Sequence, residues 1–236
     1  MNHPLPKRIN ELDWRRIRAD LDAHGHATAG PIFDAAECRT LAGLWDSARF
    51  RSEIEMGPRR YGEGVYRYFA APLPAPVRTL RQQLYARLAP IANDWWRRLG
   101  REPAFPARLR PFLSRCHEAG QPRPTPLLLR YERGGYNCLH QDRYGRIAFP
   151  LQAAVLLSRP GRDFEGGEFL LVEQRPRAQS RGDAIGLRQG EMILFPNAER
   201  PVEGARGPYR AAVRHGVSRV RAGKRCTLGV IFHDAE

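Results

Sequence analysis

The chain of 236 residues is short of lysine, of long apolar runs and of paired cysteines. No apolar run approaches the ~18 residues that a membrane-spanning helix needs. Residues 1–10 are polar and lack the apolar segment of a secretory signal. The four cysteines form no CxxC pair and are too few for a disulfide scaffold. These absences predict a cytoplasmic globular protein with reduced thiols, no membrane partner and a monomeric state.

Positive charge is abundant. The 39 basic residues against 25 acidic ones give a net charge of +14, and all the basic residues except Lys7 and Lys224 are arginine. Between Arg175 and Arg225, 12 basic and four acidic residues give +8. Such a surface attracts nucleic acid or another polyanion. An arginine excess beside many Ala, Pro and Gly is also what GC-rich coding produces, so both explanations stay open.

The first half of the chain is predicted to be largely helical. Asp34 to Glu37 has the form of a capping box that opens a helix. Apolar residues recur every three or four positions from Ala75 to Leu99, which predicts a long helix ended by Gly100. Six prolines between Pro103 and Pro126 predict a surface connection without an element of its own.

After Pro126 the pattern changes to short β-rich runs separated by Gly, Pro and Asp. Eight such runs without intervening helices predict a jelly roll. The runs are Leu127–Glu132, Tyr136–Gln141, Ile147–Ser158, Glu168–Glu173, Ala184–Leu187, Glu191–Phe195, Arg210–Ser218 and Arg225–Phe232. The predicted fold class is α+β: a double-stranded β-helix, residues 126–236, supported by helices in residues 1–125, as one structural unit.

A cluster of metal-ligating residue types falls on these strands. His140 and Asp142 are two positions apart at a strand end, so both side chains reach one face. His215 lies in a later predicted strand. Two histidines and one carboxylate are the facial triad of non-haem Fe(II) oxygenases, which leaves the opposite face of the metal open. Arg225, ten residues after His215, is suited to hold a carboxylate with two hydrogen bonds.

This combination resembles the iron(II)- and 2-oxoglutarate-dependent dioxygenases, over about Leu127 to Ala235. The resemblance implies that His140, Asp142 and His215 bind Fe(II) and that Arg225 binds the distal carboxylate of 2-oxoglutarate. Tyr131 matches a tyrosine that points at the same carboxylate in that family, although it is equally suited to fill the core. The implied reaction consumes dioxygen, releases succinate and CO₂, and hydroxylates a C–H bond.

The substrate is predicted from three further resemblances. Leu139-His-Gln-Asp142 resembles the AlkB-type nucleic-acid demethylases, which carry a second arginine where this chain has Ile231. The Gly166-Gly167-Glu168 turn and the short interval between His215 and Arg225 resemble prolyl-hydroxylase-type enzymes. The closing pattern RHGVSxxRxGxRxxLGxIFHDA, from Arg214 to Ala235, resembles a bacterial family described as an oxygenase acting on damaged nucleic acid.

Oxidative demethylation of alkylated bases, as in DNA repair, is therefore the predicted function. Arg60, Tyr61, Arg177 and Arg181 are candidate substrate contacts, because aromatic rings stack on an extruded base and arginines bind phosphate. Two alternatives stay open: a protein or prolyl-type side-chain hydroxylase, and a non-enzymatic jelly-roll module that binds a metal or another ligand.

Overall fold

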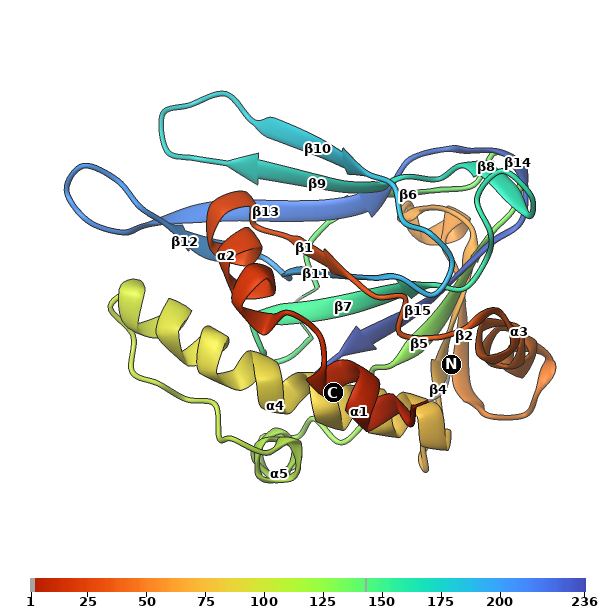
Figure 1. The fold of residues 1–236 in the computed structure, drawn as a ribbon, viewed down its shortest axis with the longest axis horizontal. Coiled ribbons are helices and arrows are strands. Elements are labelled where there is room, and N and C mark those ends of the chain that lie inside the picture. The colour runs from red at the N-terminus through yellow and green to blue at the C-terminus, as the bar shows by residue number, and fades with distance from the viewer. Residues whose placement is uncertain (1–2, 143) are drawn as a thin grey trace.

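The protein forms three layers in the computed structural model, which describes residues 3–142 and 144–236. Helices cover one face of a large sheet, and a smaller sheet covers the other face (Figure 1). The helices are α1 Leu5–Asn10, α2 Trp14–His24, α3 Ala35–Gly43, α4 Ala75–Arg98 and α5 Leu109–Glu118, with short 3₁₀ turns η1 Leu44–Asp46 and η2 Gly57–Arg59. Among the described residues, no helix has both the length and the apolar character needed to cross a membrane.

The two facing sheets are antiparallel throughout. The seven-stranded sheet has the order β1 Ala27–Ala29, β11 Met192–Pro196, β7 Leu151–Leu156, β15 Arg225–Ile231, β5 Leu127–Tyr131, β4 Val65–Phe69 and β2 Phe50–Glu55. The six-stranded sheet has β10 Arg181–Ile185, β9 Phe169–Gln174, β13 Tyr209–Val217, β6 Tyr136–His140 and β3 Gly62–Glu63 in that order, with β12 Glu199–Val202 also paired to β13. A separate ribbon joins β14 Val220–Gly223 to β8 Phe164–Gly166.

Strand alternation divides the seven-stranded sheet into an apolar face and a functional face. On β15, Cys226, Leu228 and Val230 are buried in the core beneath the helices. The alternate residues Arg225, Thr227 and Gly229 line a cavity between the two sheets. Because successive side chains in a strand point to opposite faces, one strand supplies both the core and the cavity.

Helix α4 confirms the predicted long helix almost to the residue. Its predicted apolar stripe is fully inside: Val77, Leu80, Leu84, Leu88, Ile91 and Trp95 are all buried. Gly100 follows the helix with a positive φ of 70°, as expected of a residue that ends one. The capping box is also confirmed, since the side chain of Asp34 accepts from the backbone of Glu37, and that of Glu37 accepts from the backbone of Asp34.

Two expectations about the first half were wrong. The proline-rich segment 103–126 contains α5, because Pro111 is the third residue of that helix, where a backbone N–H has no helical partner to lose. The first 125 residues are also not merely a helical support. Strands β1, β2 and β4 form part of the large sheet, and β3 joins the small one. Strands β1, β2 and β3 were missed because they are short or partly exposed, so their sequences carry little alternation. The run from Val65 to Ala70 is interpreted from the sequence as a possible strand, and β4 lies there.

Each of the eight strands predicted after Pro126 has a counterpart in the structure. The largest difference is at the third, where residues 147–150 lie outside β7. The prediction missed β8, β12 and β14, which are three or four residues long. Strands that short contain too few residues to show a period of two.

Candidate metal centre and its pocket

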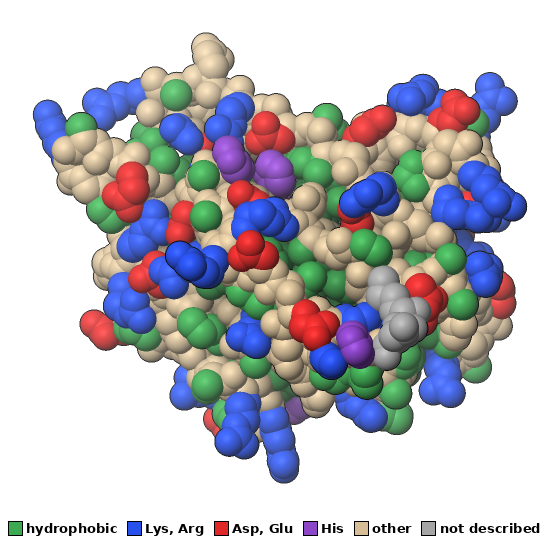
Figure 2. Space-filling model, in the orientation of Figure 1, with side chains coloured by type: hydrophobic (Ala, Val, Ile, Leu, Met, Phe, Trp, Pro, Cys, Tyr) green, Lys and Arg blue, Asp and Glu red, His purple; other side chains and the backbone are tan. Residues whose placement is uncertain are grey.

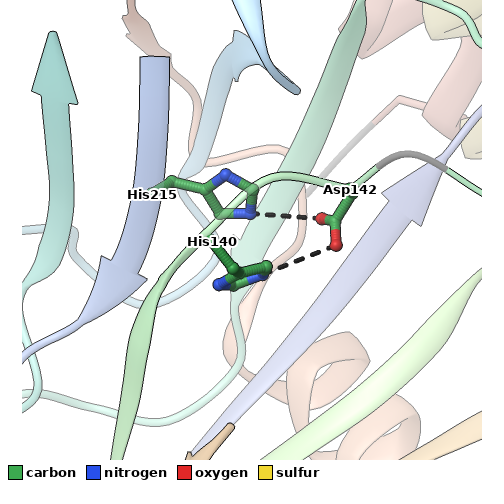
Figure 3. A group of neighbouring side chains, drawn as sticks. All are labelled: His140, Asp142 and His215. Carbon is green, nitrogen blue, oxygen red and sulfur yellow. Dashed lines mark hydrogen bonds and ion pairs between the residues drawn. The ribbon is translucent and has the colours of Figure 1, made fainter. Parts of the chain in front are cut away.

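Three ligand-type side chains converge between the two sheets, as the sequence predicted. His140 ends β6, and its register partner across the ladder is His215 on β13. Asp142 follows β6, and its carboxylate faces both imidazoles (Figure 3). Its Oδ2 is 3.1 Å from His215 Nε2, and its Oδ1 is 3.5 Å from His140 Nε2.

This donor set fits a divalent iron. The three ligand atoms lie within 4.8 Å of one another, and they comprise two imidazole nitrogens and one carboxylate oxygen. The Nδ1 of His140 is 2.8 Å from the carbonyl of Cys138, so a proton held there leaves the Nε2 lone pair free for a metal. These three residues are the only group of this kind among the described histidines, cysteines and acids.

Two further residues hold the carboxylate in place. The hydroxyl of Tyr144 donates to Asp142 Oδ1 over 2.6 Å, and the amide of Asn197 donates to the backbone carbonyl of Asp142 over 3.1 Å. Such supporting hydrogen bonds fix the orientation of a ligand before the metal arrives.

The protonation states also suit a cation. Burial opposes ionisation of Asp142, but hydrogen bonds from the two histidines outweigh it and hold its pKa well below the ordinary value. Burial lowers the pKa of His215, which favours the neutral imidazole that a metal binds. For His140, burial acts in the same direction, but the hydrogen bond to Asp142 outweighs it and raises the pKa. Because a metal binds the neutral imidazole, metal binding at His140 competes with its protonation.

A cavity of about 430 Å³ opens onto these three residues and has Arg225 on its wall. Arg225 is 3% exposed, and its Nη1 donates to Thr227 Oγ1 over 2.6 Å. Its Nε has no hydrogen-bond partner, and no carboxylate among the described residues forms an ion pair with it. Burial lowers its pKa. Glu168 interacts with this cation only from beyond ion-pair distance. A buried cation without a carboxylate in contact is costly, so this residue is suited to an anionic ligand.

Glycine makes room for this arginine. The backbone of Gly167 has a φ of 64°, and a Cβ there would lie 2.7 Å from Arg225 Cδ. A side chain at position 167 would therefore displace the guanidinium. The Gly166-Gly167 turn, noted in the sequence as a family resemblance, thus has a local steric role. Tyr131 is fully buried and packs beside the same guanidinium, with the centre of its ring 5.8 Å from Arg225 Cζ.

The mouth of the cavity carries the two large apolar side chains that are most exposed. Tyr61 is 49% exposed and Leu139 43%, and no other large apolar residue of the described chain is classed as exposed. Both line the cavity with Arg60. The N–H of Cys138 donates to the carbonyl of Tyr61 over 2.8 Å, which joins the two sides of the mouth.

Arg177 and Arg181, the other two candidate substrate residues, lie elsewhere. Arg177 is in the turn between β9 and β10, and Arg181 begins β10 and donates to the carbonyl of His24. Neither lines the cavity. Figure 2 shows Lys and Arg side chains spread over a whole face of the molecule and interspersed with acids.

Sequence reasoning missed Tyr144 and Gln152, which line the cavity, and Asn197, which holds the backbone of Asp142. The signal for Tyr144 was its position two residues after a metal ligand. Gln152 is the single polar residue in the run Leu151–Leu157, so its burial between apolar neighbours was a readable signal. Tyr66 and Tyr68 also line the cavity, because β4 pairs with β5.

Comparison with known proteins now places the chain in a family. Residues 64–235 match the model of the Oxygenase-NA family, described as an oxygenase catalysing oxidative methylation of damaged DNA. The chain belongs to this family. The uncharacterized Mycobacterium tuberculosis protein MT2286 is 52% identical over 167 residues, which cover 71% of this chain and 72% of that protein.

Solved structures share the fold at low sequence identity. An oxidoreductase of the 2-oxoglutarate–Fe(II) oxygenase family from Burkholderia pseudomallei superposes with a TM-score of 0.55 at 19% identity, over 96% of this chain and 93% of that one. A Trichoplax adhaerens prolyl hydroxylase, in complex with a hypoxia inducible factor peptide, gives 0.58 at 14% identity, over 96% and 90%. The predicted double-stranded β-helix is confirmed.

Family, fold and the His140–Asp142–His215 cluster together support an Fe(II)- and 2-oxoglutarate-dependent oxygenase, as the sequence predicted. The non-enzymatic module is thereby set aside.

Proposed function

We propose that this oxygenase removes an alkyl group from a damaged nucleic-acid base. In the proposal, His140, Asp142 and His215 hold Fe(II), while Arg225 and Tyr131 bind 2-oxoglutarate. Arg60 and Tyr61 contact the substrate at the mouth of the cavity. We assign no contact with the reacting base to Arg177 and Arg181, because both residues lie outside the cavity.

The observation that carries the reaction class is the position of Arg225. Its buried guanidinium, which has no acidic partner among the described residues, lines the same cavity as the three ligand-type residues. A dicarboxylate bound there neutralises a charge that the fold leaves unpaired. Thr227 supports this role, because its hydroxyl accepts from Nη1 and orients the guanidinium.

When bound, the iron supplies the oxidising power: dioxygen and 2-oxoglutarate are consumed, succinate and CO₂ are released, and one oxygen atom enters a substrate C–H bond. The protein's residues position the partners and exclude water from the cavity. Hydroxylation of an N-methyl group gives an N-hydroxymethyl base. Its C–N bond then breaks, and the hydroxymethyl carbon leaves as formaldehyde. The repaired base keeps its ring nitrogen.

The mouth supports a nucleic-acid substrate. A half-exposed tyrosine beside an arginine suits stacking on an unpaired base together with contact to phosphate. The net charge of +14 favours approach of a polyanion. The description of the matched family, damaged DNA, points the same way.

The test is succinate release from 2-oxoglutarate with Fe(II) in air, with and without a single-stranded oligonucleotide that carries N-methylated bases. We expect the oligonucleotide to stimulate succinate release, with formaldehyde in equal yield. Rising salt should weaken the stimulation, because counterions compete for phosphate contacts. Asp142→Ala is the matched control and should bind no iron and release no succinate.

The remaining outcomes separate the alternatives. A rate of succinate release that no oligonucleotide changes would reject the nucleic-acid substrate. It would favour a protein or peptide hydroxylase, which adds 16 Da to its target. Full activity in Asp142→Ala would reject the metal-site assignment.

A further inference from the structure

One polar side chain at the bottom of the cavity has no structural partner. Gln152 lies in the middle of the apolar strand β7 and is 3% exposed. Its Nε2, a strong donor, makes no hydrogen bond with any residue that the structure describes. Leaving a buried donor unpaired destabilises the folded protein. The side chain lines the cavity, so a ligand bound there lies beside this amide.

Strand register places Gln152 far from the anion-binding end of the cavity. Its partner on β15 is Ile231, six residues beyond Arg225. At about 3.3 Å per residue the two ends of that strand segment are roughly 20 Å apart. A five-carbon diacid held by Arg225 separates its carboxylates by only about 6 Å, given C–C bonds of about 1.5 Å. The register therefore separates the Gln152 amide from 2-oxoglutarate.

The neighbours of Gln152 are aromatic and apolar. Ile231 packs with Tyr68 and Leu127, and Tyr66 and Tyr144 lie against that cluster. On the other side, the register partner of Gln152 on β11 is Phe195, whose ring centre is 4.7 Å from that of His215. The amide thus lies close to the metal ligands, at the floor of a compartment walled by aromatic rings.

We infer that this compartment holds the reacting base and that Gln152 selects it by donating from Nε2 to a ring carbonyl. The inference rests on the proposed function and names the feature of the base that is recognised. A site that is mostly apolar, with one placed polar group, orients a planar aromatic ring rather than a phosphate. Loss of a hydrogen-bond partner that such a site requires causes strong discrimination between substrates.

The test compares two single-stranded oligonucleotides that differ at one base. N3-methylcytosine carries a ring carbonyl, and N1-methyladenine has none. For the wild-type chain we expect kcat/KM for demethylation to be about 10-fold or more higher on N3-methylcytosine. In Gln152→Leu this preference should fall to near unity, while the KM for 2-oxoglutarate stays as in the wild type.

Stability provides a second readout. Gln152→Leu replaces an unpaired buried donor with an apolar group, so its Tm should equal or exceed that of the wild type. A purely structural role for Gln152 predicts a lower Tm instead. Gln152→Met gives the same test with an unbranched side chain, in case leucine does not fit the site.

Thr227→Val is the matched control at the opposite end of the cavity. It removes the hydroxyl that holds Arg225, so it should raise the KM for 2-oxoglutarate and leave the base preference intact.

Each failure has its own pattern. A wild-type chain that prefers N1-methyladenine, or a Gln152→Leu variant that keeps the wild-type preference, overturns the role of Gln152 alone. A wild-type chain that acts on neither oligonucleotide overturns the proposed function, and this inference with it.

Discussion

Buried arginines occur in two kinds of surroundings in this protein. Arg81 and Arg200 are almost fully buried, and each contacts a buried acid: Arg81 is 2.7 Å from Asp234, and Arg200 is 2.5 Å from Glu173. Both also donate to backbone carbonyls. Arg225 is equally buried but forms no ion pair with a described acid. The first two complete their own hydrogen bonding, and the third needs a ligand to do so.

This difference separates residues that stabilise the fold from residues that serve the reaction. Removing one partner of a buried ion pair lowers the stability of the fold, because the other charge stays buried without its partner. An unpaired buried cation costs stability until an anion arrives. Mutations at the two kinds of site should therefore act on different measurements, and the predictions below use that contrast.

The largest effect is expected at the paired arginine. Arg81→Met leaves the carboxylate of Asp234 buried without its cation, and Arg81 also binds the carbonyls of Ile231 and Phe232. We expect the free energy of unfolding to fall by about 3–5 kcal/mol. Urea unfolding followed by circular dichroism measures this loss. A urea midpoint of Arg81→Met equal to that of the wild type would contradict the distinction between paired and unpaired buried arginines.

Acid should destabilise the same region through His233. Burial is the main cause that lowers the pKa of this 1%-exposed histidine to about 4, and its Nδ1 accepts from the N–H of Phe149. Because the folded pKa lies below the unfolded value of about 6.5, the stabilisation is complete above pH 6.5 and is lost as the pH falls towards 4. Between pH 7.5 and 5 the loss should be about 2 kcal/mol.

His233→Asn sharpens this prediction, because the amide oxygen of asparagine accepts from Phe149 but does not titrate in this range. The difference in unfolding free energy between pH 7.5 and 5 should shrink by about the same 2 kcal/mol in the variant. Equal pH dependence in both proteins would assign the acid sensitivity to other groups.

At the unpaired arginine the effect should fall on ligand binding. Arg225→Met should weaken 2-oxoglutarate on the order of 30-fold, since loss of a charged hydrogen-bonded contact costs about 2 kcal/mol or more. Without ligand, the variant should be at least as stable as the wild type. Thermal unfolding with Mn²⁺, with and without 2-oxoglutarate, shows both: the ligand raises the wild-type Tm and not that of the variant.

The smallest expected effect concerns Tyr144, which holds Asp142 through one hydrogen bond. Tyr144→Phe should weaken Fe(II) or Mn²⁺ binding about 10-fold, the lower end of what such supporting contacts contribute. Calorimetric titration with Mn²⁺ measures it without turnover. Phe149→Leu alters a buried aromatic outside the cavity and serves as a control for packing, with metal affinity unchanged.

Local patterns predicted the parts of the fold and site that depend on neighbours in sequence. The stripe of α4, the capping box at Asp34 and the pairing of His140 with Asp142 on one face all follow from fixed periods along the chain. His215 was found because a facial triad needs a third ligand, and Arg225 because an arginine suits a carboxylate; the family resemblance then assigned their roles. The helix α5 was missed because prolines were counted without asking where in a helix each would fall.

The sequence by itself determined which residues form the eight longer strands after Pro126, which faces are apolar and which side chains are suited to bind a metal. Only the tertiary structure decided that strands from the first 70 residues complete the large sheet and that Tyr68 lies against Ile231. It also decided which arginine remains without an acid and which glutamine without a partner. The physical reason is that periodicity fixes a side chain's direction, whereas burial and pairing depend on segments that meet only when the sheets close.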